Sequence, residues 1–349
     1  VQVAGSVDLR GSAPMARDSI FRIASITKPI VAAAAMVLVE DGRMALDDPV
    51  ERWLPELASR VVLRRPDGPV DDVVPAARPI TVRDVLDSRA GYGFPSDFSL
   101  PVVRLLSAVQ AGPRPHLLPA PDKWLARLAG IPLLHQPGQG WLYNTCYDIL
   151  GVLIARVSGC PLPEFLAERL FEPLGMRDTG FEVPAGKRDR FTSYYQADPS
   201  GALQLLDAPD GWWSSPPAFP SGAGGLVSTV DDWFAFARML LAEGEAGGRR
   251  LLSAAAVRQM TTDQLTSAQR QAGRLFLEGQ GWGFGGSVDV EVIEPWNVPG
   301  RYGWVGGTGT TAHITAATGA VAILLSQVEM AGPTPPVVMR DFWRYAATA

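Results

Sequence analysis

The 349-residue chain has few of the residues that usually build metal sites and disulfide frameworks. It contains two cysteines, Cys146 and Cys160, and three histidines, His116, His135 and His313, which are far apart. None of them has a metal-ligand spacing, and two cysteines do not make a disulfide framework. We therefore expect buried free thiols, structural or surface histidines, and no metal ion or other cofactor.

Clusters of one charge sign and long apolar runs are scarce as well. The formal net charge is −5 and no run is rich in Lys and Arg, so we expect no nucleic-acid binding. The longest apolar run, residues 30–39, is too short to span a bilayer, and we expect no membrane association. The residues after Val1 lack a basic region followed by an apolar one, so we expect a cytoplasmic protein. A signal segment trimmed before Val1 would leave secretion open.

Lysine is the third scarce residue type. The chain has only Lys28, Lys123 and Lys187, while arginine supplies nearly all the other positive charge. Lys28 follows Ser25 by three positions and precedes an Ala-rich apolar run at residues 29–39, which is typical of a buried helix. The Ser25 hydroxyl and the Lys28 amine would then lie on one side, one turn apart. Burial would lower the pKa of Lys28, and a neutral amine can activate a serine without histidine.

Taken alone, this tetrapeptide has a second interpretation. Ser25 could be the N-cap of the helix, and Lys28 a solvated charge in its first turn. Pro29 requires only that the helix start nearby, because proline is tolerated in a first turn, where backbone donors have no helical partner. The rarity of lysine favours the catalytic interpretation, since arginine cannot lose its proton in a protein.

Local patterns predict further elements around this segment. The helix that contains Lys28 should extend from about residue 25 to residue 40 and stop before Gly42. Three residues are predicted N-caps of helices: Thr81, Thr229 and Ser253. The other expected elements are a strand at residues 1–9, a loop at 60–80, a helix from about 145 to 159, strands at 311–315 and 320–327, and a helix at 336–347.

Five segments, taken in chain order, carry a more specific signal than the tetrapeptide. They are FRIASITKP at 21–29, PGQGWLYNT at 137–145, FEPLGM at 171–176, SGAGGLVST at 221–229 and YGWVGGTGT at 302–310. Together they resemble the serine β-lactamase-like superfamily over nearly the whole chain, and most closely its family VIII esterases and class C β-lactamases. The resemblance implies a β-lactamase/transpeptidase-like α/β (α+β) fold, with an antiparallel sheet flanked by helices and a mostly helical lobe.

The resemblance also implies roles for individual residues. Ser25 would be the acylated nucleophile, and Lys28 would hold Ser25 and Tyr143 in one proton network. Tyr143 would be the base toward Ser25 or the acid toward the leaving group, helped by a phenol pKa that the lysine cation lowers. The N–H groups of Ser25 and Gly307 would form the oxyanion hole. Without the resemblance, Tyr143 would be interpreted as a core or rim aromatic.

Two departures from the family pattern bear on the substrate. Trp304 begins a Trp-Val-Gly run where β-lactamases have Lys-Thr-Gly, whose lysine helps to anchor the substrate carboxylate, so Trp304 favours uncharged acyl groups. Thr145 stands where class C enzymes have an amide, which weakens recognition of a β-lactam side chain. The aromatic segment that contains Trp212 is expected either to line the acyl pocket or to pack between the lobes. The residues expected at the substrate are Trp304, Val305, Gly306, Thr145 and Trp212.

These observations predict two domains and a small-molecule ester as substrate. Residues 1–59 and 221–349 would form an α/β domain, residues 60–220 a mostly helical one, and the active site would lie between them. The expected function is a serine hydrolase that cleaves carboxylic esters of short to medium acyl chains through an acyl-enzyme. The alternatives are an acyltransferase, a β-lactamase or D-alanyl peptidase, and a non-catalytic binding member of the fold. An α/β-hydrolase is excluded, because no serine has a glycine two residues before and two residues after it.

Overall fold

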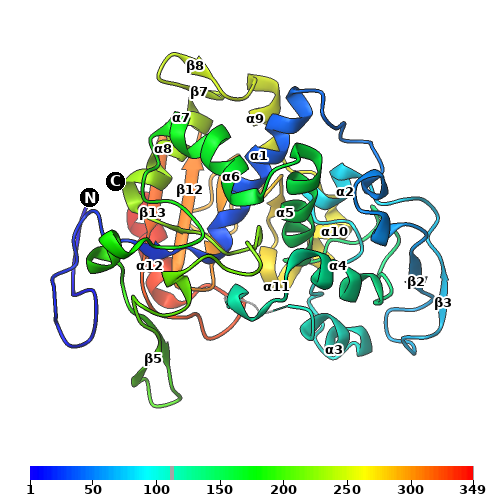
Figure 1. Ribbon diagram of the computed structural model, residues 1–349, viewed down its shortest axis with the longest axis horizontal. Coiled ribbons are helices and arrows are strands. Elements are labelled where there is room, and N and C mark those ends of the chain that lie inside the picture. Colours follow the sequence, from blue (N-terminus) through cyan, green and yellow to red (C-terminus); the bar gives the residue numbers. More distant parts are fainter. Residues whose placement is uncertain (111–113, 349) are drawn as a thin grey trace.

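The computed structural model describes residues 1–110 and 114–348, and Figure 1 shows how its helices and small antiparallel sheets are arranged. The α-helices are α1 (Lys28–Glu40), α2 (Val82–Leu86), α3 (Pro101–Ser107), α4 (Pro121–Ala129), α5 (Thr145–Ser158), α6 (Leu162–Leu166), α7 (Glu172–Leu174), α8 (Val230–Leu241), α9 (Ala254–Met260), α10 (Ser267–Ala272), α11 (Arg274–Leu277) and α12 (Val337–Ala346). The strands are β1 (Phe21–Arg22), β2 (Val61–Leu63), β3 (Val73–Pro75), β4 (Tyr194–Ala197), β5 (Leu203–Asp207), β6 (Val227–Ser228), β7 (Glu245–Ala246), β8 (Arg249–Arg250), β9 (Gly281–Trp282), β10 (Ser287–Val288), β11 (Arg301–Gly306), β12 (Thr310–Thr315) and β13 (Ala320–Leu324).

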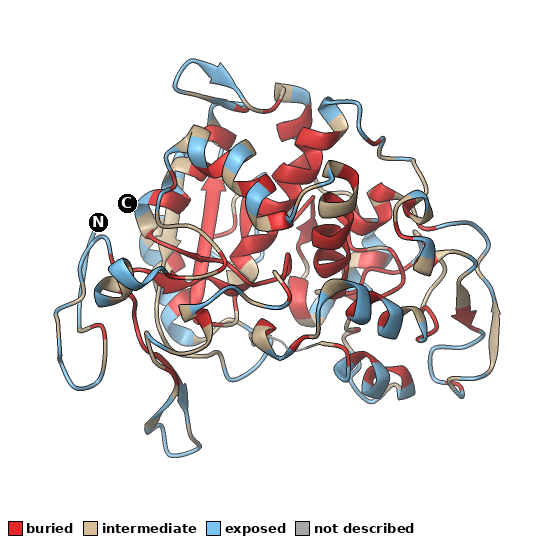
Figure 2. Ribbon diagram, in the orientation of Figure 1, coloured by how far each residue is buried: buried red, intermediate tan, exposed pale blue. Residues whose placement is uncertain are grey.

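Helix α1 crosses the middle of the molecule and is buried over most of its length (Figure 2). Residues 28–38 are all buried, because small and aliphatic side chains meet neighbours on every side of the helix, including α5. The predicted helix is confirmed, and Gly42 with φ of +68° follows its end. Its start differs from the expectation: Ser25 lies in a 3₁₀ turn, η1 (Ala24–Thr27), and α-helical structure begins at Lys28.

A five-stranded antiparallel sheet in the order β13-β12-β11-β10-β9 lies beside α1. Strand β11 is central, and five of its six residues are buried, because it contacts the η1 turn while its sheet is also covered by α8 and α12. The predicted strands at 311–315 and 320–327 are confirmed, although β13 already ends at Leu324. A short pair, β1 with β6, joins Phe21 to Ser228 in the segment that precedes the η1 turn.

The helices α2 to α5 and the β2–β3 hairpin occupy the opposite side of α1 from the sheet (Figure 1). Two local expectations were wrong. Residues 60–80, expected as a loop, contain the β2–β3 pair, and residues 1–9, expected as a strand, form only the isolated bridge between Ser6 and Pro14. Because the α10–α11 segment also reaches this side, the division into residues 60–220 and the remainder of the chain stays a proposal.

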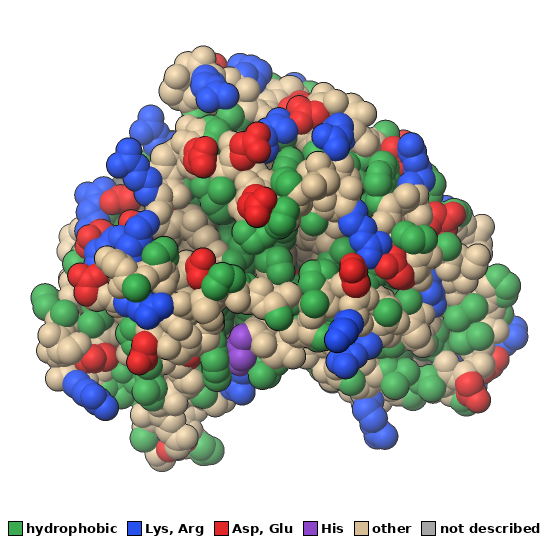
Figure 3. Space-filling model, in the orientation of Figure 1, with side chains coloured by type: hydrophobic (Ala, Val, Ile, Leu, Met, Phe, Trp, Pro, Cys, Tyr) green, Lys and Arg blue, Asp and Glu red, His purple; other side chains and the backbone are tan. Residues whose placement is uncertain are grey.

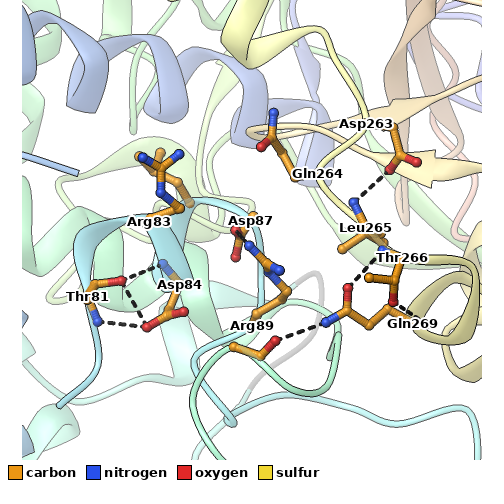
Figure 4. Close-up of polar contacts among 12 residues, drawn as sticks. Thr81, Arg83, Asp84, Asp87, Arg89, Asp263, Gln264, Leu265, Thr266 and Gln269 are labelled. Carbon is orange, nitrogen blue, oxygen red and sulfur yellow. Dashed lines mark hydrogen bonds and ion pairs between the residues drawn. The ribbon is translucent and has the colours of Figure 1, made fainter. Parts of the chain in front are cut away.

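The predicted helix caps have a common geometry. The Thr81 hydroxyl accepts from Asp84 N, and the Asp84 carboxylate accepts from Thr81 N, so the first turn of α2 is a capping box (Figure 4). Thr229 caps α8 and Ser253 caps α9 through their hydroxyls. All three predicted caps are therefore confirmed.

Surface charges are mixed in sign on the face drawn in Figure 3, where basic and acidic side chains alternate over short distances. Within the described residues, no single helix has the length and apolar character needed to cross a membrane. The bent pair Thr145–Ser158 and Leu162–Leu174, at 81°, meets that requirement jointly, by length and composition only.

Candidate active site

The nucleophile candidate sits in a constrained turn. Ala24, directly before Ser25, has φ of +43°, a region that non-glycine residues seldom adopt. Ser25 itself is half-buried, and the turn continues into α1, with Pro29 in the first helical turn as predicted. The turn thus places the Ser25 hydroxyl at the head of a buried helix, where it can face both a cavity and the Lys28 side chain.

Lys28 is fully buried and makes four polar contacts. Its Nζ lies 2.8 Å from Ser25 Oγ, 2.8 Å from Asn144 Oδ1, 2.6 Å from Ala223 O and 3.4 Å from Tyr143 OH. Burial disfavours the charged amine and lowers the pKa of Lys28 to about 7, against the opposing effect of a carboxylate on α5. The predicted direction of this pKa shift is therefore confirmed.

That carboxylate belongs to Asp148, which is buried on α5. It accepts hydrogen bonds from Ser221 Oγ at 2.6 Å and from Ala223 N at 3.2 Å. Burial raises the pKa of Asp148 to about 6, while these hydrogen bonds and Lys28 oppose the rise. Asp148 thereby holds the 221–223 backbone in the position from which the Ala223 carbonyl reaches Lys28.

Tyr143 completes the polar cluster around Ser25. Its hydroxyl donates to Ser25 Oγ at 2.9 Å and accepts from Trp304 Nε1 at 2.8 Å. Burial raises the pKa of Tyr143, and the hydrogen bonds with Ser25 and Trp304 only reduce this effect. The prediction of a lowered phenol pKa was wrong, because desolvation acts on the phenol directly and also lowers the pKa of Lys28, which weakens the cation that should have helped.

The backbone on both sides of Tyr143 is fixed by hydrogen bonds to distant segments. Phe94 N donates to Tyr143 O at 2.9 Å, and Tyr143 N donates to Phe94 O at 3.0 Å. The turn before it is held by Gln269, whose Nε2 donates to Gly138 O at 2.9 Å and to Gln139 O at 3.1 Å. Gln269 lies in the first turn of α10, and Figure 4 shows that its side-chain oxygen also accepts from Thr266 N in the capping box of this helix. Helix α10 is therefore tied to the segment that leads to Tyr143.

Gly307, the other oxyanion-hole candidate, lies in the turn between β11 and β12. It lines the same cavity as Ser25, and its carbonyl accepts from Met330 N at 2.8 Å, which fixes the turn on its outer side. Ser25, Tyr143 and Gly307 thus line one cavity, and the buried Lys28 lies within hydrogen-bond distance of Ser25 without lining it.

Two threonines on the β11–β12 connection bind the backbone before the nucleophile. Thr308 Oγ1 donates to Arg22 O at 2.6 Å, and Thr310 Oγ1 donates to Ile23 O at 2.9 Å. Gly306 allows this approach, because a Cβ there would lie 2.2 Å from Thr310 Oγ1 and 2.5 Å from Ile23 O. Gly306 thus serves the close contact of the two segments and does not line the cavity.

The cavity beside Ser25 has a volume of about 260 Å³ and is mainly apolar. Among the described residues that line it, none carries a charge. Trp304 and Val305 line the cavity as predicted, whereas Thr145 and Trp212 do not. Thr145 is buried behind the cavity, and the Trp212 ring stacks on the His116 ring with centroids 3.7 Å apart. The lining residues are Ala24, Ser25, Phe94, Phe98, Tyr143, Asn144, Gly224, Phe276, Trp304, Val305, Gly307, Met330, Gly332 and Pro333.

Two important lining residues were not predicted. Asn144 has φ of +83° and places its carboxamide oxygen 2.8 Å from Lys28 Nζ. An amide directly after Tyr143 was a readable signal for this. Phe276 of α11 stacks on the Tyr143 ring, with centroids 4.7 Å apart, and the sequence gives no local sign of that contact.

The described residues contain no group of three or more His, Cys, Asp or Glu side chains that could hold a metal ion. The only activating groups beside Ser25 in the described cluster are the Lys28 amine and the Tyr143 phenol. Such a cluster can exchange one proton between a hydroxyl, an amine and a phenol, which suits nucleophilic catalysis of acyl transfer.

Comparison with known proteins shows the family and the fold of the chain. A family model described as Beta-lactamase matches residues 1–337. Protein Rv1367c from Mycobacterium tuberculosis is 40% identical over 316 residues, which cover 88% of this chain and 77% of that one. Esterase EstB from Burkholderia gladioli is 30% identical over 362 residues, covering 97% and 85%. The solved structure of EstCE1, a hydrolase with promiscuous acyltransferase activity, superposes with a TM-score of 0.81 at 26% identity and covers 99% of this chain and 89% of that one.

Proposed function

The chain belongs to the beta-lactamase family and has its β-lactamase/transpeptidase-like fold, and on that premise we propose that it is a serine esterase. It would cleave carboxylic esters of short to medium acyl chains through an acyl-enzyme on Ser25. One observation carries the proposal: Ser25 Oγ lies 2.8 Å from Lys28 Nζ and 2.9 Å from Tyr143 OH, beside a cavity without charged lining residues.

The neighbours of Lys28 favour its neutral amine as the base. A neutral amine has two N–H groups and one lone pair, and Ala223 O and Asn144 Oδ1 accept two N–H groups. The lone pair is then left for the third close neighbour, the Ser25 hydroxyl. Ser25 Oγ attacks the ester carbonyl carbon while its proton passes to Lys28 Nζ, which gives a tetrahedral oxyanion and an ammonium. The pKa of about 7 makes both forms of Lys28 accessible near neutral pH.

Tyr143 would then act as the acid for the leaving alcohol. Its raised pKa keeps the hydroxyl protonated, and its contact with Ser25 places it next to the tetrahedral centre. The bond from carbon to the alkoxide oxygen breaks as that oxygen takes the phenol proton, and the Lys28 ammonium returns a proton to the phenolate. Trp304 Nε1 donates to the same oxygen and would stabilise the transient phenolate. Water repeats the sequence on the acyl-enzyme and releases the carboxylic acid.

The cavity supports an uncharged acyl group. Trp304 occupies the position of the lysine that would bind a carboxylate, and the aromatic walls from Phe94, Phe98 and Phe276 offer only apolar contacts. Burying a carboxylate there without a partner would be costly. The similarity to Esterase EstB supports esters over β-lactams or D-alanyl peptides.

An acyltransferase is the second candidate. EstCE1 is described as a hydrolase that also transfers acyl groups, and an apolar cavity can admit an alcohol in place of water. The acyl-enzyme on Ser25 would be the same, and only the acceptor that attacks it would differ. A non-catalytic binding member is disfavoured by the hydrogen-bonded Ser25, Lys28 and Tyr143 cluster.

The test is parallel turnover of p-nitrophenyl butyrate and a chromogenic cephalosporin. We expect ester turnover that is lost in Ser25→Ala, by at least about 10⁴-fold, and little cephalosporin turnover. Ser200→Ala, at an exposed serine, is the matched control and should keep the wild-type rate. Adding butanol separates the two candidates, because butyl butyrate forms only if an alcohol competes with water. Ester turnover that survives in Ser25→Ala would overturn the proposal.

A further inference from the structure

A line of hydrogen bonds leaves the active site behind Asn144. Asn144 Nδ2 donates to Gln110 Oε1 at 3.0 Å, and Gln110 Nε2 in turn donates to Thr145 Oγ1. Gln110 and Thr145 do not line the cavity, and Thr145 is fully buried. Neither therefore touches the substrate that the proposed function requires, although both connect to Lys28 through one carboxamide.

The hydrogen bonds in this line all run in one direction. A charged lysine has only donors, so its neighbour in Asn144 has to be the carboxamide oxygen. The Asn144 nitrogen then points the other way and needs an acceptor, which Gln110 Oε1 supplies. That orientation leaves the Gln110 nitrogen facing Thr145, whose hydroxyl oxygen accepts. Each amide thus fixes the direction of the next, and Thr145 sets the end of the series.

We propose that Gln110 and Thr145 are positioning residues that hold the Asn144 carboxamide with its oxygen on Lys28. The inference rests on the proposed function and deepens it. Without Gln110, the carboxamide of Asn144 is free to rotate by half a turn and to present its nitrogen to Lys28. A donor there would bind the lone pair of the neutral amine, which would then no longer face the Ser25 hydroxyl. The two residues would thereby decide whether Lys28 can accept the proton.

The rotated state predicts a distinctive pH profile for Ser25 acylation. An N–H group facing Lys28 disfavours the ammonium, so the acid limb of the profile should move to lower pH while the plateau falls. A general loosening that admits water would relieve the desolvation of Lys28 and move the same limb to higher pH. The other titratable groups facing Lys28 are Asp148 and Tyr143, and neither is changed by the variants below.

The experiment measures the rate at which an alkyl fluorophosphonate labels Ser25, by intact mass, together with kcat/KM for p-nitrophenyl butyrate from pH 5 to 10, values chosen to bracket the Lys28 pKa of about 7. We expect Gln110→Leu to lower both plateaus about tenfold to a hundredfold, as loss of an orienting partner does. Gln110→Glu is the matched control, since its carboxylate still accepts from Asn144 Nδ2. It should keep the plateau near that of wild type and move the acid limb to higher pH, because its negative charge favours the ammonium.

Thr145 supplies the second, independent pair of variants. Thr145→Val keeps the shape but removes the acceptor, and we expect a smaller fall in the same direction as in Gln110→Leu. Thr145→Ser restores the hydroxyl and should restore most of the rate, and thermal unfolding checks that all four variants fold. Unchanged profiles in Gln110→Leu and Thr145→Val, or a limb that moves to higher pH in both, would overturn the positioning role. Labelling or turnover that persists in Ser25→Ala would instead overturn the proposed function itself.

Discussion

The two sides of the active site are held in place by different forces. The nucleophile side, residues 21–40, is an apolar helix whose position follows from burial on every face. The tyrosine side, residues 137–145, is a turn and an extended segment held by hydrogen bonds to Phe94 and Gln269. Apolar packing tolerates small shifts of a side chain, whereas a hydrogen bond fixes one atom against another. The proposed base, Lys28, is thus buried by packing, and the proposed acid, Tyr143, is oriented by polar contacts.

Burial nevertheless has the same chemical effect on both sides, because it favours the uncharged form of each group. It lowers the pKa of Lys28 and raises that of Tyr143, so each group is pushed toward its uncharged form. A neutral amine can accept a proton and a neutral phenol can give one, which is the pair of roles that acylation needs. The difference between the two sides therefore lies in how the groups are positioned and not in how they are tuned.

The largest effect should come from removing the proposed base, Lys28. Lys28→Met keeps an unbranched apolar side chain in the helix, and we expect kcat/KM to fall toward the upper end of roughly 10²–10⁴-fold. In the wild type, kcat/KM should decline as pH drops below about 7, because protonated Lys28 cannot accept the Ser25 proton. The pH profile and single-turnover acylation measure both effects. A loss of less than tenfold in Lys28→Met would transfer the base role to the tyrosine side.

Removing the hydroxyl of Tyr143, the proposed acid, tests the tyrosine side. Tyr143→Phe keeps the ring that stacks on Phe276 and removes only the hydroxyl, so we expect a loss toward the lower end of roughly 10²–10⁴-fold. Because p-nitrophenolate is a better leaving group than ethoxide, its departure needs less help from an acid. The loss should therefore be greater for ethyl butyrate than for p-nitrophenyl butyrate. Equal losses for both esters would contradict a role in protonating the alcohol.

Gly306→Ala tests how closely the β11–β12 end must approach the segment that precedes Ser25. The new methyl group would lie 2.2 Å from Thr310 Oγ1 and 2.5 Å from Ile23 O. We expect the free energy of unfolding to fall by about 1–3 kcal/mol, since forced overpacking costs that much. Gly186→Ala, where a methyl group meets open space, is the matched control in the same urea titration. A Gly306→Ala variant as stable as the Gly186→Ala control would show that Thr310 and Ile23 move aside for the added methyl group at no cost in stability.

Trp304→Phe should have the smallest effect. It keeps an aromatic wall but removes the N–H that donates to Tyr143 OH, and a single hydrogen bond contributes about 1 kcal/mol. We expect a severalfold loss in kcat with the alkaline limb of the profile moved to higher pH, because the phenolate loses a donor. Trp343→Phe, whose indole donates to Thr311, is a matched control that leaves Tyr143 untouched. An alkaline limb that stays in place would show that the Trp304 N–H does not affect the ionisation of Tyr143.

The nucleophile side, which is held by apolar packing, was the easier one to predict from sequence. An Ala-rich apolar run defines a buried helix by composition alone, and the same burial gives the direction of the Lys28 pKa shift. Thr81, Thr229 and Ser253 were equally readable, because a cap is decided by contacts within four residues. These features depend on neighbours in sequence, so the sequence contains what is needed.

The tyrosine side, which is held by hydrogen bonds, could not be predicted in this way. Tyr143 was identified only through a family resemblance, and its partners Phe94, Phe276 and Trp304 come from three other segments. Trp212 was placed at the substrate because it is aromatic, but aromatic character does not say which surface a ring will meet. Its partner His116 became evident only from the fold.

Thr145 shows the same limit at a single position. The family pattern placed it at the substrate, but its side chain is buried and faces Gln110, while Asn144 lines the cavity. Asn144 has a positive φ, and its carboxamide oxygen faces Lys28. Backbone conformation of this kind depends on tertiary contacts, which a sequence pattern does not show.

Under the proposed function, the contacts of Lys28 also determine when the chain becomes reactive during folding. Its amine bonds to residues that are 3, 115, 116 and 195 positions away along the chain. Such long-range contacts close late, since each requires a large loop to form first. Until they close, Lys28 is exposed to water with the ordinary basicity of a lysine, and Ser25 is an ordinary alcohol. Under the proposed function, a nascent or partly folded chain would therefore be inert toward esters, and its reactivity would arise in the same step that completes the fold.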